Sequence, residues 1–185
     1  MSSTADWQAG GFGIYIHWPF CEAKCTYCDF NSHVVSSIAH EAWIRAYLAE
    51  IDRYAAEIGA RTVTSVFFGG GTPSLMQPAT IEAVLNKIRT IWPVSNDFEV
   101  SLEANPSSFE IRKFKGFKSA GINRVSIGVQ ALNDNDLKLL GRLHTETEAR
   151  RAVEEAFRLF DRVSADFIYA RQHQSINSWD SELRE

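Results

Sequence analysis

Short runs of β-branched and aromatic residues alternate along the chain with longer segments of helical periodicity, and this alternation restricts the fold more than any other feature. The runs predict strands at Gly13–His17, Val63–Phe68, Phe98–Glu103, Arg124–Val129 and Val163–Tyr169. Apolar residues at helical spacing predict helices over Ser36–Ile58, Ala79–Ile91, Phe109–Ala120, Asp134–Leu140 and Glu146–Phe160. Strands joined by helical crossovers form a parallel sheet, so we expect an α/β fold of about five β/α units.

Parallel strands with right-handed crossovers form either a doubly wound sheet or a barrel, and periodicity does not distinguish the two. The chain has 185 residues, of which 45% are hydrophobic and 12% aromatic, enough to bury the core of one domain. No low-complexity stretch or internal linker interrupts the pattern. A fibrous, collagen-like or mainly disordered chain is therefore excluded.

The charge balance is mildly acidic, with 19 Lys and Arg against 23 Asp and Glu and a formal net charge of -4. No block of Lys and Arg forms a stripe that would bind phosphates, so nucleic acid is not an expected partner. The first residues lack the basic and apolar regions of a secretory signal, and no apolar run is long enough to span a bilayer. We therefore expect a cytoplasmic protein without a membrane span.

All the cysteines, Cys21, Cys25 and Cys28, lie within the stretch CEAKCTYC. An odd number of cysteines at such close spacing argues against a disulfide framework and favours shared metal ligation. A structural zinc site would need a fourth ligand, for which His17 or His33 is available. A four-iron cluster held by only three thiolates would instead leave one iron open to a small molecule.

The segment Tyr15–Phe30, YIHWPFCEAKCTYCDF, resembles the radical S-adenosylmethionine (SAM) superfamily, whose hallmark is C-x3-C-x2-C with an aromatic residue before the last cysteine. The Tyr-x-His-x-Pro-Phe lead-in is similar to the group that contains oxygen-independent coproporphyrinogen III oxidase and the HemW haem chaperone. The segments FFGGGTPSLM, SLEANP, GINRVSIGVQ, LGRLH and DFIYA resemble the same group in the same order. The resemblance runs from Gly13 to the end of the chain.

This resemblance implies a partial, TIM-like (β/α) barrel of about six units. The chain supplies about five, so we expect a radical SAM barrel that is open and incomplete at its C-terminal edge. In domain terms, residues 1–12 would form an N-terminal tail and residues 13–185 a truncated radical SAM core without the family's C-terminal domain. In the segment ARQHQS, Gln172 and His173 stand where the group usually has Pro-Gly, which predicts a differently shaped loop and a relaxed rim around the site.

The resemblance also assigns the site residues. It gives Cys21, Cys25 and Cys28 to a [4Fe-4S] cluster whose fourth iron chelates SAM, and reductive cleavage of SAM then yields a 5'-deoxyadenosyl radical. No side chain is assigned a catalytic role. The implied SAM contacts are Tyr15, Tyr27, Gly70, Gly71, Thr72, Glu103, Gln130, Arg142 and Asp166.

Several of these residues also have an ordinary structural explanation. The glycines after the second strand could form a tight turn, Asp166 could belong to a buried salt bridge, and Tyr15 could be a packing residue of the first strand. Glu103 closes a strand at its carboxyl end, where barrel proteins bind their ligands. Arg142 offers a two-pronged donor for a carboxylate.

Two functions compete within the resembling group. The oxidase decarboxylates propionate side chains of coproporphyrinogen III, whereas the chaperone binds haem and delivers it to acceptor proteins. The oxidase group carries a further cysteine two residues after the third, a position that is Phe30 here, so we expect the HemW type. A tRNA-modifying radical SAM enzyme and a zinc-binding structural protein are less favoured alternatives.

The partners expected from the resemblance are haem or a porphyrinogen, haem-acceptor proteins, and an electron donor such as a flavodoxin or ferredoxin. Haem is also a candidate cofactor beside the cluster and SAM. The sequence does not identify a haem ligand among the histidines at 17, 33, 40, 144 and 173. His17, next to the cysteine motif, is the first of them to test.

Overall fold

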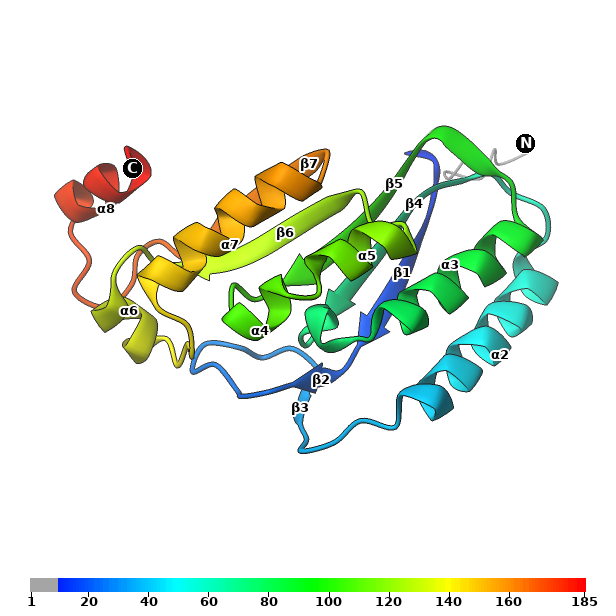
Figure 1. Cartoon of the computed structure of the whole chain (residues 1–185), viewed down its shortest axis with the longest axis horizontal. Coiled ribbons are helices and arrows are strands. Elements are labelled where there is room, and N and C mark those ends of the chain that lie inside the picture. Colours follow the sequence, from blue (N-terminus) through cyan, green and yellow to red (C-terminus); the bar gives the residue numbers. More distant parts are fainter. Residues whose placement is uncertain (1–9) are drawn as a thin grey trace, which may run out of the picture.

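The computed structural model describes residues 10–185, without the side chains of residues 108 and 109, so the predicted N-terminal tail lies mostly outside the described residues. A five-stranded parallel sheet forms the centre of the molecule (Figure 1). All five predicted strands are present. The strands are β1 (Phe12–Trp18), β4 (Val63–Gly70), β5 (Val94–Ala104), β6 (Arg124–Gln130) and β7 (Arg162–Phe167).

The order of the strands resolves the choice between a doubly wound sheet and a barrel. The sheet order is β1-β4-β5-β6-β7, which is the order along the chain, and every neighbouring pair is parallel. A doubly wound sheet reverses its direction of winding partway, whereas a barrel adds each strand on the same side. The fold is therefore a partial TIM-like barrel wall.

Helices follow the strands and pack on one face of the sheet, where α2 contacts α3, α3 contacts α5, and α5 contacts α7 (Figure 1). A short 3₁₀ turn, η1 (Pro73–Leu75), follows β4. The helices are α2 (His40–Ile58), α3 (Pro78–Ile91), α4 (Ser108–Ile111), α5 (Phe114–Ala120), α6 (Asp134–Leu139), α7 (Glu146–Leu159) and α8 (Ile176–Leu183).

Several element boundaries differ from the sequence-based prediction. The first long helix begins at His40 rather than Ser36. The predicted helix Phe109–Ala120 is divided into α4 and α5, and at the division the Lys113 N–H donates to the Glu110 carbonyl (2.9 Å), a hydrogen bond of the tighter 3₁₀ type. Strand β5 begins at Val94, directly after a proline, and strand β7 ends two residues before the predicted Tyr169.

Alternation along the strands gives the sheet two different faces. Towards the helices, β4 and β5 bury Val66, Phe68, Val100 and Leu102 completely. Each large apolar side chain buried in this way contributes roughly 1.5–3 kcal/mol to folding. The opposite face is the interior side of the barrel wall. Because successive residues of a strand point to opposite faces, polar residues such as Glu103 lie on it. The hydrophobic core thus lies between sheet and helices, and the polar face is left for a ligand.

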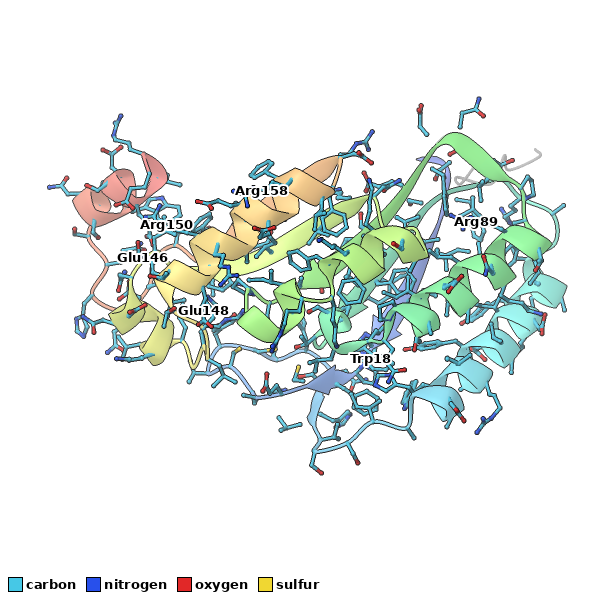
Figure 2. All side chains as sticks on the ribbon, in the orientation of Figure 1. Trp18, Arg89, Glu146, Glu148, Arg150 and Arg158 are labelled. Atoms are coloured by element: carbon cyan, nitrogen blue, oxygen red, sulfur yellow. The ribbon has the colours of Figure 1, made fainter. Side chains whose placement is uncertain are left out.

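An aromatic cluster fixes the end of β1 against α2, at the lower edge of the view in Figure 2. Trp18, labelled there, is fully buried. Its ring lies 5.1 Å from Phe20, 5.9 Å from Trp43 and 6.4 Å from Tyr47, measured between centroids. The Tyr47 hydroxyl also donates to the carbonyl of His17 (2.6 Å). This packing anchors the start of the segment that carries the cysteines.

The C-terminal helix α8 stands beyond α6 and α7, at the far left of Figure 1. None of its residues is buried. Tyr169 and Trp179 are in ring contact, with centroids 6.3 Å apart. Among the described residues, no helix combines the length and apolar character needed to cross a membrane.

Candidate functional site

A cavity of about 290 Å³ lies at the carboxyl ends of the strands, where parallel barrels place their ligands. Its wall combines the cysteine loop, the glycine-rich loop that starts at the end of β4 with Gly69, Gly70 and Gly71, and side chains from β5, β6 and β7. Eleven of the twelve sequence-predicted site residues line it, and Tyr15 does not. The eleven are Cys21, Cys25, Tyr27, Cys28, Gly70, Gly71, Thr72, Glu103, Gln130, Arg142 and Asp166.

The cysteine loop runs along the lower edge of Figure 1, between the two short strands β2 (Phe20–Cys21) and β3 (His33–Val34), towards α6. Thr26 fastens it there: its N–H donates to the Leu140 carbonyl (3.2 Å) and its hydroxyl to the Leu139 carbonyl (3.1 Å). Within the loop, the Cys28 N–H donates to the Cys25 carbonyl (3.2 Å). These contacts hold the thiols on the cavity wall.

The glycine-rich loop passes so close to the cysteine segment that side chains would not fit. Gly70 has a φ of +116°, and a Cβ there would lie 2.6 Å from Nδ1 of His17. A Cβ on Gly71 would lie 2.7 Å from the carbonyl oxygen of Phe20 and 3.0 Å from Sγ of Cys21. The Gly71 N–H donates to the Trp18 carbonyl (2.7 Å). Gly70 and Gly71 are therefore more than a tight turn, since they let this backbone form part of the cavity.

Glu103 projects from the end of β5 and accepts a hydrogen bond from the Gly70 N–H (3.2 Å). Burial raises the pKa of this carboxyl, and the neighbouring Asp166 carboxylate raises it further, while the Gly70 N–H and His17 act in the opposite direction. One carboxylate oxygen thus braces the glycine loop. The carboxyl remains on the cavity wall, where it can accept hydrogen bonds from ligand hydroxyls.

Arg142 connects the cysteine loop with the strand ends. Its Nη2 donates to Oδ1 of Asn105 (2.6 Å) and to the Gly128 carbonyl (2.9 Å), and its Nη1 lies 3.5 Å from Sγ of Cys25. The guanidinium is held by neutral acceptors, so its charge is not cancelled by a carboxylate within these contacts. This arrangement suits recognition of an anionic group in the cavity.

Asp166 forms hydrogen bonds to a hydroxyl rather than an ion pair with a cationic side chain of the described residues. Both of its oxygens accept from the Ser126 hydroxyl (3.0 and 2.9 Å), and Ser126 in turn accepts from Ser164 (2.9 Å). Asp166 is exposed on the cavity side of β7, so the predicted alternative of a buried salt bridge is wrong. At the end of β6, Gln130 has a φ of +70°, a left-handed conformation uncommon for a residue other than glycine.

The two predicted tyrosines occupy different environments. Tyr27 lines the cavity between Cys25 and Cys28; burial raises its pKa to about 12, against the opposing effect of Arg142. Tyr15 lies outside the cavity lining, 57% exposed, with its ring stacked on Phe67 at 6.0 Å and its hydroxyl 3.4 Å from Nδ1 of His17. Whether Tyr15 contacts a cofactor stays a prediction.

Among the lining residues that sequence reasoning did not assign to the site are Asn105, Ser126 and Gly128. Ser126, Gly128 and Gln130 alternate along β6, so a period of two starting from the predicted Gln130 would have found the other two. Asn105 follows β5 directly and lies within the motif SLEANP. Its local sequence gives no sign that its amide joins Arg142 and Thr72.

The donors in the cavity suit an iron–sulfur cluster better than a single zinc ion. In the part of the chain that the structure describes, no three His, Cys, Asp or Glu side chains converge closely enough to hold one metal ion. His17, a possible fourth zinc ligand, has its Nε2 3.0 Å from the Asn31 carbonyl. A cluster distributes thiolates over several irons, so three thiols along one wall, with no fourth, match its chemistry.

His144 anchors the segment after Arg142 and gives a prediction on pH. It is buried, its Nε2 lies 3.1 Å from the Val129 carbonyl, and burial together with the charge of Arg142 lowers its pKa to about 4. The unfolded chain therefore binds a proton that the folded chain does not between about pH 6.5 and pH 4. We expect the free energy of unfolding to fall across this window as the pH falls, by at most about 1.4 kcal/mol per pH unit from this group.

Urea unfolding of the metal-free chain at pH 7 and pH 5 measures this effect. His144→Gln should have a smaller pH dependence than the wild type, and replacement of the exposed His33 by Gln should leave the dependence unchanged. An unchanged dependence in His144→Gln would contradict the assignment.

Comparison with known proteins shows which family the chain resembles. The family model described as "Radical SAM superfamily" matches residues 15–183. The HemW haem chaperone of Escherichia coli is 38% identical over 174 residues, and "Radical S-adenosyl methionine domain-containing protein 1, mitochondrial" of Bos taurus is 42% identical over 172. These alignments cover 93% and 92% of this chain but only 46% and 39% of the relatives.

A solved structure agrees with the sequence relatives. Coproporphyrinogen III oxidase (HemN) of Escherichia coli superimposes with a TM-score of 0.82 and 28% identity, covering 93% of this chain and 40% of the oxidase. The chain thus spans less than half the length of each relative named. The sequence match, the parallel barrel wall and the cavity with three cysteines lead to one conclusion: the chain belongs to the radical SAM superfamily.

Proposed function

We propose that this chain is the SAM-binding core of a HemW-type haem chaperone, which binds haem and delivers it to acceptor proteins. The observation that carries this choice is the residue at position 30. Phe30 stands where the oxidase group has its additional cysteine, and it lines the cavity as a residue that is 63% exposed. An apolar ring at the cavity mouth suits a flat, apolar ligand better than it suits metal ligation.

The proposed assignment gives each part of the cavity wall one task. Cys21, Cys25 and Cys28 hold a [4Fe-4S] cluster, which together with SAM supplies one-electron reductive chemistry when both are bound. Arg142 binds the carboxylate of SAM. The backbone of Gly70 and Gly71, which carry no side chain, contacts the amino group of SAM.

The remaining polar residues of the wall suit the nucleoside half of SAM. Glu103 and Asp166 accept hydrogen bonds from the ribose hydroxyls, and Gln130 lies beside them on the wall. Tyr27 covers the adenine, since its partly buried ring adjoins the cysteine loop. These roles come from the family resemblance, and the shared cavity supports them.

A second candidate function is oxygen-independent coproporphyrinogen III oxidation. The structural match to HemN favours it, because the two chains share the same barrel wall at 28% identity. The proposed partners follow from these two functions: haem or a porphyrinogen, haem-acceptor proteins, and a flavodoxin or ferredoxin as electron donor. We propose a cytoplasmic location by analogy with the bacterial chaperone, although relatives named as mitochondrial also match.

The proposed function predicts separable spectroscopic results. After anaerobic reconstitution, we expect four irons and four sulfides per chain, a cluster signal that changes when SAM is added, and a saturable haem spectrum. Haem bound to the chain should pass to apomyoglobin, used as a general acceptor. Absence of transferable haem, with conversion of coproporphyrinogen to a vinyl-bearing product, would favour the oxidase instead. One bound zinc that ignores SAM would contradict both functions.

A further inference from the structure

Asn105 joins two parts of the cavity wall that are far apart in the sequence. Its Oδ1 accepts from Nη2 of Arg142 (2.6 Å), and its Nδ2 donates to Oγ1 of Thr72 (3.3 Å). Both halves of the amide are used, so only one orientation of the side chain satisfies both partners. The amide therefore ties the Arg142 guanidinium to the glycine-rich loop.

Both partners of Asn105 also contact cysteines. Thr72, which is buried, donates from Oγ1 to Sγ of Cys21 (3.4 Å), and Nη1 of Arg142 lies 3.5 Å from Sγ of Cys25. A shift of the amide would therefore change the surroundings of two of the three thiols at once. Such a side chain is suited to set the geometry of the cavity without being a ligand.

Behind Asn105 lies a buried carboxylate, Glu110 on α4, with 1% of its surface exposed. Its Oε2 accepts from the Asn105 backbone N–H (2.8 Å) and from the Ser74 hydroxyl. Glu110 is absent from the lining of the cavity of 290 Å³, so its hydrogen bonds reach that cavity through Asn105 and Ser74, and its charge acts on Arg142. Burial raises its pKa to about 7, while the hydrogen bonds from Ser74 and Asn105 act in the opposite direction by stabilising the charged form.

Lys113, one turn after Glu110, also contacts the segment behind the cavity wall. Its Nζ donates to the carbonyls of Ser74 (3.2 Å), Leu75 (3.1 Å) and Met76 (3.3 Å). These residues follow the glycine-rich loop directly, and Ser74 also bonds to Glu110. The α4–α5 segment therefore holds the loop after β4 from behind, through one carboxylate and one ammonium.

We propose that Asn105 and Glu110 are positioning residues that hold Arg142 and Thr72 in the geometry required to bind the methionyl end of SAM. The inference rests on the proposed SAM site and adds to it two residues that need not touch the ligand. Asn105 sets the direction of the guanidinium, and Glu110 fixes the backbone from which Asn105 projects. The order of dependence runs from Glu110 to Asn105 to Arg142.

The first test compares two asparagines on the same sheet. Asn105→Ala in the reconstituted chain should weaken SAM binding about tenfold, while iron and sulfide content stay at the wild-type level. The matched control is Asn123→Ala, because the Asn123 amide also bridges two groups, the Val100 N–H (2.8 Å) and the Phe98 carbonyl (2.8 Å), in the middle of β5 and away from the cavity lining. This control should lower stability but leave the dissociation constant for SAM unchanged.

The second test examines the order of dependence. Glu110→Gln keeps an acceptor oxygen for the Asn105 N–H and should retain SAM affinity within about threefold, whereas Glu110→Leu should weaken it about tenfold. If Glu110 acts through Asn105, the double variant Asn105→Ala with Glu110→Leu should bind SAM no more weakly than Asn105→Ala alone. Additive losses would overturn the relay.

A third measurement does not need SAM or the cluster. In the metal-free chain, Asn105→Ala should speed amide hydrogen exchange in the segments 69–76 and 140–144, and Asn123→Ala should not. Unchanged exchange in both segments, or equal SAM losses in Asn105→Ala and Asn123→Ala, would overturn the inference. A wild-type chain that binds a cluster but shows no response to SAM would contradict the proposed function, while the exchange result would still decide whether the relay exists.

Discussion

Cys28→Ser should leave a folded chain that retains almost no iron or sulfide after anaerobic reconstitution. Serine replaces a thiolate with a hydroxyl that is a poor ligand for iron, and the three cysteines supply all the thiolates in the chain. The variant should lose metal binding but keep its fold, because the Cys28 side chain is only partly buried and lies outside the hydrophobic core. We therefore expect the free energy of unfolding of the metal-free variant to differ from that of the metal-free wild type by no more than about 1 kcal/mol.

Iron and acid-labile sulfide per chain, together with the visible absorption of the cluster, measure this loss. Asp29→Asn is the matched control, since the exposed Asp29 adjoins Cys28 in the same loop. The control should reconstitute like the wild type. If Cys28→Ser still held stoichiometric zinc or iron, the three thiols would not act as one ligand set, and the SAM site proposed beside them would lose its basis.

The fold was largely predictable because its information is periodic. Buried positions on β4 and β5 such as Phe68 and Leu102 alternate, and α3 repeats apolar residues at helical spacing, so each element could be recognised alone. The strand order was not visible in the periodicity and needed the family resemblance. The break between α4 and α5 could not be predicted, since it depends on contacts that Glu110 and Lys113 make with the distant η1 turn.

Some residues of the candidate site could likewise be predicted from the sequence, and others could not. Residues such as Cys21 and Gly71 belong to motifs whose spacing is itself a signal, and the structure brings them to one cavity. Asn105 and Glu110 carry no such signal, because a single polar residue becomes informative only when its burial and its partners are known. The same holds for Arg171, which lies in the segment that the sequence predicted to be a relaxed rim.

The structure shows that this segment is organised around Arg171, whose side chain is 4% exposed. Its Nε donates to Oδ2 of Asp136 (2.8 Å), its Nη2 to Oε2 of Glu182 on α8 (2.5 Å), and its Nη1 to the Gln130 carbonyl (3.3 Å). Glu182 also accepts from the Leu132 N–H (2.6 Å). His173 adopts a φ of +64°, a left-handed conformation. The glycine that the group usually has at this position would adopt it more easily. The loop is thus fixed by a buried ion cluster instead of by turn-forming residues.

Arg171→Met should consequently lower the free energy of unfolding by about 3–5 kcal/mol, because it leaves the Glu182 carboxylate, 8% exposed, without its cation. Urea unfolding gives the global loss, and hydrogen exchange in α8 should show that this helix, which buries no apolar side chain, detaches first. Arg184→Met is the control, since Arg184 pairs with Asp180 on the same helix at 75% and 59% exposure and should change stability by less than about 0.5 kcal/mol.

A second substitution separates lost charge pairing from lost packing. Arg171→Met combined with Glu182→Met removes the uncompensated carboxylate and fills the space with apolar atoms, so it should recover at least about 1 kcal/mol of the single variant's loss. Equal losses in the single and double variants would mean that the aliphatic part of Arg171 and its bonds to backbone carbonyls, rather than its pairing with Glu182, hold this edge of the barrel. Recovery would instead show that the loss in Arg171→Met comes from leaving the Glu182 carboxylate buried without its cation at the end of β6, next to Gln130 on the cavity wall.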